Sequence, residues 1–288
     1  MSMRIKRRSA AYYRAMRRVR QFALGCLTAL LLFYVLFPYY WAIVSSTKQG
    51  AELYNSVLLP ALDFRHYKEL FRDANFATSI LNSLCVAIAT TALSLGLGTL
   101  AAYALGRLNF PERRSLLLTV LMISIFPQVV VLSGMFELIR WFGLYNRVWS
   151  LVFAYLIFTL PFTTWVLTSF IREFPRELEE AAIMDGCSHW RILTSILLPL
   201  MGPALVSTGL LAFILAWNEF LFALTFTLTE GSRTVPVAIG LLAGNSRYEY
   251  PFGPIMAASV TVTLPLIVLV LFFQRKIVAG LTAGAVKG

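Results

Sequence analysis

Six long stretches of apolar residues alternate with shorter polar segments along the chain. A helix needs about 20 mostly apolar residues to cross the hydrocarbon core of a bilayer, and all six stretches come close to or exceed that length. Five of them contain no Asp, Glu, Lys or Arg, whereas the fifth in order contains Glu219. The pattern therefore predicts an all-α membrane protein with six transmembrane helices. They are Phe22–Val44, Ile80–Leu105, Leu116–Phe136, Trp149–Ile171, Met201–Phe226 and Ile255–Phe273.

The sequence predicts one membrane domain over residues 22–276, with a basic tail of residues 1–21 before it and a tail of residues 277–288 after it. No repeat of 20–50 residues and no low-complexity segment divides it further. Four prolines lie inside the predicted spans, where membrane helices tolerate them if neighbouring groups satisfy the freed carbonyls. They are either bending points or passive kinks, and the sequence leaves both readings open. These prolines are Pro38, Pro127, Pro161 and Pro265.

Composition agrees with a membrane protein. Charged residues make up 14% of the 288 residues and hydrophobic ones 58%, whereas about a quarter of a soluble domain is charged. The formal net charge of +11 does not indicate nucleic-acid binding, because eight of the 25 basic residues lie within the first twenty positions, directly before an apolar stretch. Such a tail is a topology signal, and attraction to anionic membrane lipids is a secondary role.

Counting Lys and Arg by segment predicts the orientation. The two tails and the loops 106–115 and 172–200 hold 17 of them, and the other loops hold 8. The positive-inside rule then places both termini and these two loops in the cytoplasm, which makes the chain a multi-pass protein of a bacterial plasma membrane. The N-terminal tail supplies most of this difference.

No catalytic or metal-binding constellation is predicted. The three cysteines form no CxxC pair, and His66 and His189 lie far apart in the sequence. The chain has no GxxxxGK[ST] phosphate-binding loop, so nucleotide must be handled by a partner. A secondary transporter driven by ion gradients would carry several acids or bases inside its spans, but only Glu219 qualifies. An intramembrane enzyme would need clustered His, Asp or Glu there, and these are absent.

The loop 172–200 is unusually polar. Pro175 and the glutamates after it predict a helix of about ten residues, and Gly186 stands where a C-terminal cap is expected. Because two alanines lie on one face of this helix, another backbone could approach closely. Ser188 can cap a second helix, which forms a helix–turn–helix elbow. The first helix is expected to present Leu178, Ala181, Ala182 and Asp185 on one face, and the second to carry Trp190, Leu193, Ile196 and Leu197 on its apolar side.

Glu180-Ala181-Ala182, followed by Gly186, Ile196 and Leu198-Pro199 at matching spacings, resembles the EAA loop of ABC-importer permeases. Asp185, the stretch 216–220 and the ending 278–288 resemble the carbohydrate importers related to the maltose permease subunit of the MalG type. This resemblance, which covers the chain from the first span onward, implies the type I permease fold. We call residues 172–200 the coupling loop, although an ordinary interfacial loop is the alternative.

The resemblance also implies a function. The chain would be the non-catalytic permease of a binding-protein-dependent importer, with ATP and magnesium bound only by a separate ATPase dimer. Its other partners would be a companion permease, either non-identical or a second copy, and an external sugar-binding protein probed by the loop 227–254. The cargo is expected to be a disaccharide resembling trehalose or maltose, with a sulfonated or phosphorylated monosaccharide as the alternative.

Three groups of residues receive roles from this resemblance. The ATPase-coupling group has Glu180 facing a basic group, Ala181 and Ala182 allowing close seating, and Gly186 making the turn; Asp185, Ile196, Leu198 and Pro199 complete it. The translocation path or gate is assigned to Trp217, Asn218 and Glu219, where a structural hydrogen bond is the alternative for Glu219. The tail residues Gly284, Val286 and Lys287 would reach the ATPase dimer, unless the tail is simply a frayed end.

Overall fold

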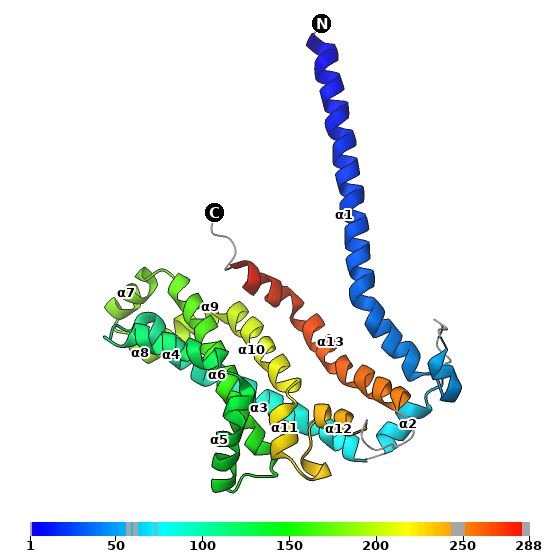
Figure 1. The fold of residues 1–288 in the computed structure, drawn as a ribbon. Helices are drawn as coiled ribbons and strands as arrows, with labels where there is room; N and C mark the ends of the chain where they lie inside the picture. The colour runs from blue at the N-terminus through cyan, green and yellow to red at the C-terminus, as the bar shows by residue number, and fades with distance from the viewer. Residues whose placement is uncertain (1, 56–58, 60–62, 73, 243–250, 284–288) are drawn as a thin grey trace. The chain divides into compact units, whose positions relative to one another are not determined.

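The computed structural model describes residues 2–55, 59, 63–72, 74–242 and 251–283. Every regular element among these residues is helical, as Figure 1 shows. The chain divides into two compact units. One consists of Met1–Lys68 with Pro251–Val260, and the other of Glu69–Tyr250 with Thr261–Gly288.

The first unit contains the long helix α1 (Ser2–Ser46), a short 3-10 turn (Gly50–Tyr54), and parts of α2 (Arg65–Arg72) and α13 (Phe252–Ala283). The second unit contains the rest of the bundle. Its elements are α3 (Ala74–Arg107), α4 (Arg113–Ile125), α5 (Gln128–Trp141), α6 (Val148–Glu173), α7 (Glu177–Met184), α8 (His189–Ile192), a π-helical turn (Leu193–Leu197), α9 (Leu198–Leu200), α10 (Gly202–Trp217), α11 (Leu221–Phe226), a 3-10 turn (Glu230–Ser232) and α12 (Val235–Leu242).

Four helices in the described part of the chain are long and apolar enough to cross a membrane, and two further pairs reach that standard as bent spans. Counting each bent pair as one span gives up to six, the number that the sequence predicts. The second pair, however, includes residues 189–200, which the sequence assigns to the loop 172–200, and stops short of residues 218–226 of the predicted fifth span. The single helices are Met16–Ser46, Ala74–Arg107, Val148–Glu173 and Phe252–Ile277. The bent pairs are Arg113–Ile125 with Gln128–Trp141 and His189–Leu200 with Gly202–Trp217.

The third predicted span, 116–136, is bent, so one of the two readings left open for its proline is resolved. The helix ends at Ile125, and the next one leaves at an angle of 97°. Phe126 and Pro127 both adopt extended backbone angles, because a residue before proline is pushed out of the helical region. The other prolines within predicted spans, Pro38, Pro161 and Pro265, lie inside continuous helices. Pro127 is therefore the one of the four that marks a break.

The fifth predicted span, 201–226, is also interrupted. Helix α10 ends at Trp217 and α11 begins only at Leu221, so Glu219 lies in the break between two helices rather than inside one. A window of hydropathy cannot reveal this break, because the residues on both sides are apolar.

Helices α3 and α6 form the centre of the second unit by close backbone approach. A Cβ atom placed on Gly98 of α3 would lie only 2.7 Å from the Cγ2 atom of Thr163 on α6. One helical turn earlier on α3, the hydroxyls of Ser94 and Thr159 share a buried hydrogen bond of 2.7 Å. Small residues and interhelical hydroxyl contacts are the means by which helices pack in lipid.

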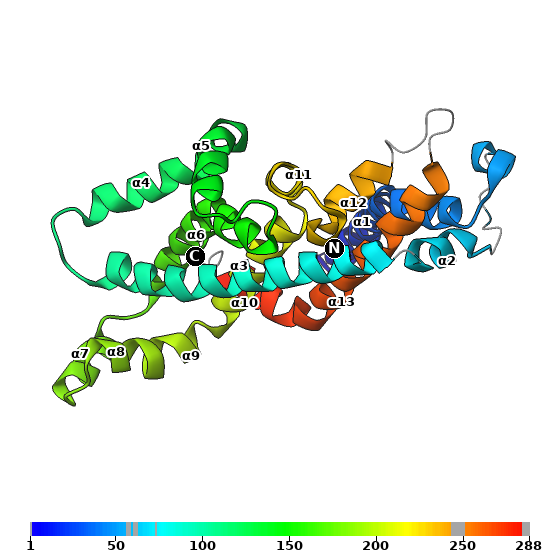
Figure 2. The ribbon, with the colours of Figure 1, turned by 90° about the horizontal axis from the view of Figure 1, so that it is seen from below.

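Two apolar clusters stabilise this central pair at its two ends. The first joins α3, α5, α6, α10 and α11 around Tyr155, Trp217 and Phe222. The second joins α3, α6 and α10 to the coupling loop through residues such as Tyr103, Ala182, and Ile192. Figure 2 shows α4 and the α7–α9 segment leaving the α3–α6 pair on opposite sides.

Candidate functional site

Helix α7 of the coupling loop begins and ends as its local sequence predicts. Its first turn carries three glutamates, which complement the positive end of the helix dipole. Gly186 has a φ of +78°, a conformation that other L-residues rarely adopt. Its amide donates to the Ile183 carbonyl, and the Cys187 amide donates to the Ala182 carbonyl, both at 2.9 Å. These two bonds make a complete Schellman motif, so the predicted glycine cap is confirmed.

The exposed face of α7 differs from the predicted one. Ala182 is only 6% exposed because it packs into the second apolar cluster of its own chain. Glu180 and Ala181 are exposed, and Met184 is 87% exposed. The prediction that Ala181 and Ala182 share one open face is therefore wrong. Three of the four residues predicted to share that face are nevertheless exposed, namely Leu178, Ala181 and Asp185. The outward-facing side chains of α7 also include Glu180, Ile183 and Met184.

A buried ion pair attaches the inner face of α7 to the end of α3. The Nε atom of Arg107 lies 2.6 Å from the Oε1 atom of Glu179, and the two side chains are 5% and 13% exposed. The N–H direction does not meet hydrogen-bond geometry, so the contact is best described as an ion pair. The same guanidinium donates through Nη2 to the Phe174 carbonyl at 2.6 Å. One arginine thereby holds both the chain before α7 and α7 itself.

The end of α3 makes further contacts with the loop. The Tyr103 hydroxyl and His189 Nδ1 lie 3.1 Å apart, which ties α3 to the start of α8. Sequence reasoning treated Arg107 only as a basic loop residue and did not single out Glu179. The signal that could have found the pair is an arginine at the end of an apolar span together with a glutamate directly before the EAA triplet.

The second helix of the elbow is partly as predicted. The Ser188 hydroxyl accepts a hydrogen bond from the Arg191 amide at 3.4 Å, which confirms the predicted cap. Leu193 and Leu197 are buried, as expected. Trp190, which the sequence places on the same apolar side, is 64% exposed.

The remaining motif residues lie where the loop returns to the bundle. Ile196 is half-buried against the second apolar cluster, whereas Leu198 and Pro199 are exposed on α9. The chain then bends by 80° into α10. The elbow predicted for this loop is thus present, and it is continuous with the core of the unit.

The break between α10 and α11 is organised by Glu219. Its carboxylate accepts hydrogen bonds from the amides of Phe222 at 2.8 Å and Ala223 at 3.1 Å, two donors that have no partner within their own helix. The side chain is buried, with 7% exposed. The buried hydroxyl of Tyr155 interacts with the same carboxylate, although without hydrogen-bond geometry. Glu219 therefore caps α11 from within its own chain.

The other two residues predicted for the path or gate lie on different sides of the same break. Trp217 is buried and stacks on Phe213, with ring centroids 5.8 Å apart. Asn218 is exposed, and its amide donates to the Ile214 carbonyl at 2.8 Å. The structure thus gives Trp217 and Glu219 contacts inside the chain and leaves Asn218 at the surface. A role in the path stays a prediction for all three.

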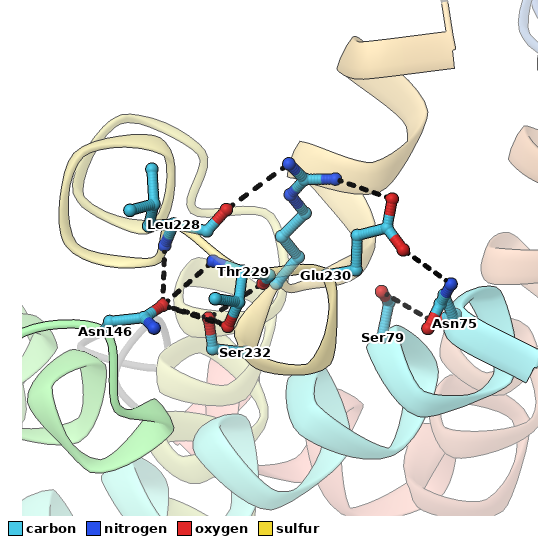
Figure 3. A network of polar contacts seen from close by, with 8 residues as sticks. Asn75, Ser79, Asn146, Leu228, Thr229, Glu230 and Ser232 are labelled. Atoms are coloured by element: carbon cyan, nitrogen blue, oxygen red, sulfur yellow. Dashed lines mark hydrogen bonds and ion pairs between the residues drawn. The ribbon is translucent and has the colours of Figure 1, made fainter.

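At the opposite end from the coupling loop, Asn146 anchors the segment after α11 (Figure 3). Its backbone has a φ of 59°, which asparagine tolerates better than most residues. Its Oδ1 atom accepts from the amides of Leu228 at 2.8 Å and Thr229 at 2.9 Å, and from the Ser232 hydroxyl at 2.6 Å. Sequence reasoning missed this residue.

The same segment is tied to α3. The Asn82 amide donates to the carbonyls of Gly231 at 2.9 Å and Arg233 at 3.0 Å, and the Asn75 amide donates to Glu230 at 2.7 Å (Figure 3). The first part of the predicted external loop 227–254 is therefore fixed to α3 and to the loop between α5 and α6 before it reaches α12.

Some predicted features lie outside the described residues. They include the tail residues Gly284, Val286 and Lys287, and residues 243–250 of the external loop. Within the part of the chain that the structure describes, no three His, Cys, Asp or Glu side chains gather in a way that could hold a metal ion.

Comparison with known proteins places these features in context. The family model described as "Binding-protein-dependent transport system inner membrane component" matches residues 70–282. The trehalose transport system permease protein SugB of Mycobacterium tuberculosis is 40% identical over 91% of this chain and 96% of its own length. The trehalose/maltose transport system permease protein MalG of Thermococcus litoralis is 42% identical over 88% of this chain and 92% of its own.

The fold is also found in a solved structure. A chain of a bacterial ABC transporter involved in the import of the acidic polysaccharide alginate superposes with a TM-score of 0.76, at 21% identity, over 90% of this chain and 96% of that one. The fold is therefore the type I permease fold that the sequence predicts.

Proposed function

Because the chain belongs to the family of binding-protein-dependent transport system inner membrane components, we propose that it is the permease subunit of an ATP-driven sugar importer. The observation that carries this proposal is the coupling loop. It presents a capped helix with Glu180, Ala181 and Met184 outward, while its inner face is fixed to α3 and α6 by Glu179 and Ala182.

Such a helix is suited to transmit movement. An exposed apolar side chain such as Met184, next to the small Ala181, fits an apolar cleft in a partner. The buried ion pair and the second apolar cluster make α7 move together with the ends of α3 and α6. A docked helix can shift the equilibrium between two states of the bundle only through contacts that differ between those states. Because α7 is rigidly attached to the bundle, a movement of α7 changes the positions of α3 and α6 as well.

The partner that binds α7 is an ATPase dimer, in which ATP and magnesium are bound and hydrolysed. Closing of the dimer draws the coupling loops together and rocks the spans from inward- to outward-facing, and hydrolysis resets them. The orientation required for this has both termini and the coupling loop in the cytoplasm, as the 17 to 8 distribution of Lys and Arg favours.

On the external side, a binding protein delivers the sugar near the segment that Asn146 and Asn82 hold in place. A second permease, non-identical to this one, completes the path. The cargo is a disaccharide of the trehalose or maltose kind, a proposal supported by the similarity to a trehalose permease and to a trehalose/maltose permease. Of Trp217, Asn218 and Glu219, Asn218 is best placed to contact the sugar, because it is exposed at the break between α10 and α11.

The test is sugar uptake by a transporter reassembled in liposomes from this chain and its native partners. Glu180→Lys combined with Gly186→Val reverses the outward charge and forces an unfavourable φ at the cap. We expect ATP-dependent uptake to be lost while the chain still inserts and assembles in the membrane. Glu112→Lys, an exposed acid in the loop before α4, is the matched control and should keep uptake.

Normal uptake by the double variant would contradict the docking role of α7. Transport by the chain with no nucleotide-hydrolysing partner present would contradict the proposed function altogether, and it would favour a gradient-driven transporter instead. The cargo is tested separately by binding of the external protein to a panel of sugars that includes trehalose, maltose and a sulfonated monosaccharide.

A further inference from the structure

An open cavity of about 830 Å³ lies where the loop between α3 and α4 meets α4 and the end of α6. Three of the eight residues lining it are arginines, and none is acidic. They are Asn109, Phe110, Pro111, Arg113, Arg114, Leu117, Leu118 and Arg172.

The three arginines have spare hydrogen-bond donors. Arg113 donates to the Gly106 carbonyl at 3.1 Å and to the Asn109 Oδ1 atom at 3.4 Å. Arg172 donates to the Leu105 carbonyl at 3.2 Å. A guanidinium has five N–H donors, so these bonds use only part of each group. For Arg114, no hydrogen bond or ion pair is found within the described residues.

The charge of these arginines is not neutralised inside the described part of the chain. The ion pairs found there are Arg65–Asp63, Arg107–Glu179 and Arg233–Glu230, none of which involves the cavity. Arg113 and Arg172 also repel each other electrostatically. An anion placed between them would gain charge-assisted hydrogen bonds and relieve that repulsion.

The position of the cavity indicates which kind of anion fits. Arg113 begins α4 and Arg172 stands one residue before the end of α6, so the guanidinium groups lie at one end of the apolar spans. Leu117 and Leu118 follow one turn further along α4, and Leu118 is 48% exposed. The lining is thus cationic at the level of lipid headgroups and apolar next to it.

We propose that this cavity binds an anionic phospholipid, with the headgroup phosphate on Arg113, Arg114 and Arg172 and an acyl chain along Leu117 and Leu118. Basic pockets between membrane helices on the cytoplasmic side are suited to anionic headgroups. A free phosphate would use the arginines but leave the apolar wall of an 830 Å³ cavity without a partner.

The experiment is a lipid titration of the purified full-length chain in detergent, followed by native mass spectrometry. The probes are phosphatidylglycerol, phosphatidylcholine with the same acyl chains, and inorganic phosphate as competitor. We expect phosphatidylglycerol to bind more tightly than phosphatidylcholine, and millimolar phosphate to displace it only weakly.

Arg114→Gln removes one charge without touching the bonds that Arg113 and Arg172 make to α3. It should weaken phosphatidylglycerol binding about fivefold, and Arg114→Lys should restore most of the loss. Leu118→Asp should weaken it through the acyl chain. Arg176→Gln, an exposed arginine outside the cavity, is the matched control and should change nothing.

Three results would each overturn the proposal: equal binding of the two lipids, equal behaviour of the Arg114 and Arg176 variants, or full displacement by inorganic phosphate. The last of these would assign the site to a soluble anion.

Discussion

The buried pair of Arg107 and Glu179 leads to a quantitative prediction about the coupling loop. Replacing Glu179 by Leu leaves the guanidinium of Arg107, now 5% exposed, without its counter-charge. Removing one member of a buried pair costs about 3–5 kcal/mol, because the remaining charge stays desolvated. Since about 1.4 kcal/mol is a factor of ten in an equilibrium constant, local opening of α7 should become on the order of 100- to 5,000-fold more frequent.

Hydrogen exchange reports this opening directly. The amides of Asp185, Gly186 and Cys187 are bonded within α7 and its cap, so a peptide covering residues 177–187 contains the reporter groups. Exchange is measured by mass spectrometry on the assembled transporter, with a peptide from α3 as internal reference. Glu177→Leu removes an exposed acid from the same turn and should change exchange by less than about fivefold, since it loses only a favourable dipole contact.

A double-mutant cycle completes the argument. Arg107→Met should open α7 as well, because it leaves the Glu179 carboxylate unpaired and also removes the bond to the Phe174 carbonyl. The combination Arg107→Met with Glu179→Leu buries two apolar side chains instead of a lone charge. Its effect on the free energy of opening of α7 should therefore be smaller than the sum of the effects of the two single changes. Additive effects, or exchange in Glu179→Leu no faster than in the Glu177→Leu control, would refute the reasoning.

Three further predictions follow from other contacts. Gly98→Ala places a methyl group 2.7 Å from the Thr163 side chain and should lower the melting temperature of the purified chain. Gly96→Ala is the control and should leave the melting temperature unchanged, because nothing lies within 4 Å of the added methyl group. Equal melting temperatures of the two variants would contradict the close approach of α3 and α6. Glu219→Gln keeps one oxygen acceptor for the first amides of α11 and should reduce sugar uptake with normal expression. Glu219→Ala removes both oxygen acceptors and should destabilise the chain by about 1–3 kcal/mol per unpaired amide. Unchanged uptake in the Gln variant would leave Glu219 a purely structural residue. Asn146→Ala removes the acceptor of the segment after α11 and should make residues 227–235 exchange faster. Unchanged exchange would show that Asn75 and Asn82 hold that segment without Asn146.

Much of the fold could be predicted because it depends on local patterns. Long apolar stretches specify helices in a bilayer, where every backbone group must be satisfied within the chain. The cap at Gly186 was predictable for the same reason, since a positive φ and a helix end require a particular residue at a particular place. The start of α8 at Ser188 followed from the same kind of local rule.

The parts that could not be predicted depend on contacts between distant residues or on exceptions to hydropathy. Helical periodicity alone does not pair Arg107 with Glu179, 72 positions away, so the inner face of α7 was not identified and Ala182 was placed on an open face. The break at Glu219 escaped detection because an acid in an apolar run looks like a ligand for cargo or ion, although here its carboxylate replaces the missing acceptors at the start of α11. Pro127 breaks its span whereas Pro161 does not, and composition alone does not distinguish the two.

The division of α7 into an inner and an outer face has a consequence for how such chains change over time. Glu179 and Ala182 contact α3 and α6 of their own chain, whereas Glu180, Ala181 and Met184 face away from it. Substitutions at the first pair should therefore be compensated within the same gene, at positions such as Arg107. Substitutions at the second group should be compensated in a different gene, the one that encodes the ATPase. The two sides of a single eight-residue helix should therefore covary with positions in two different proteins.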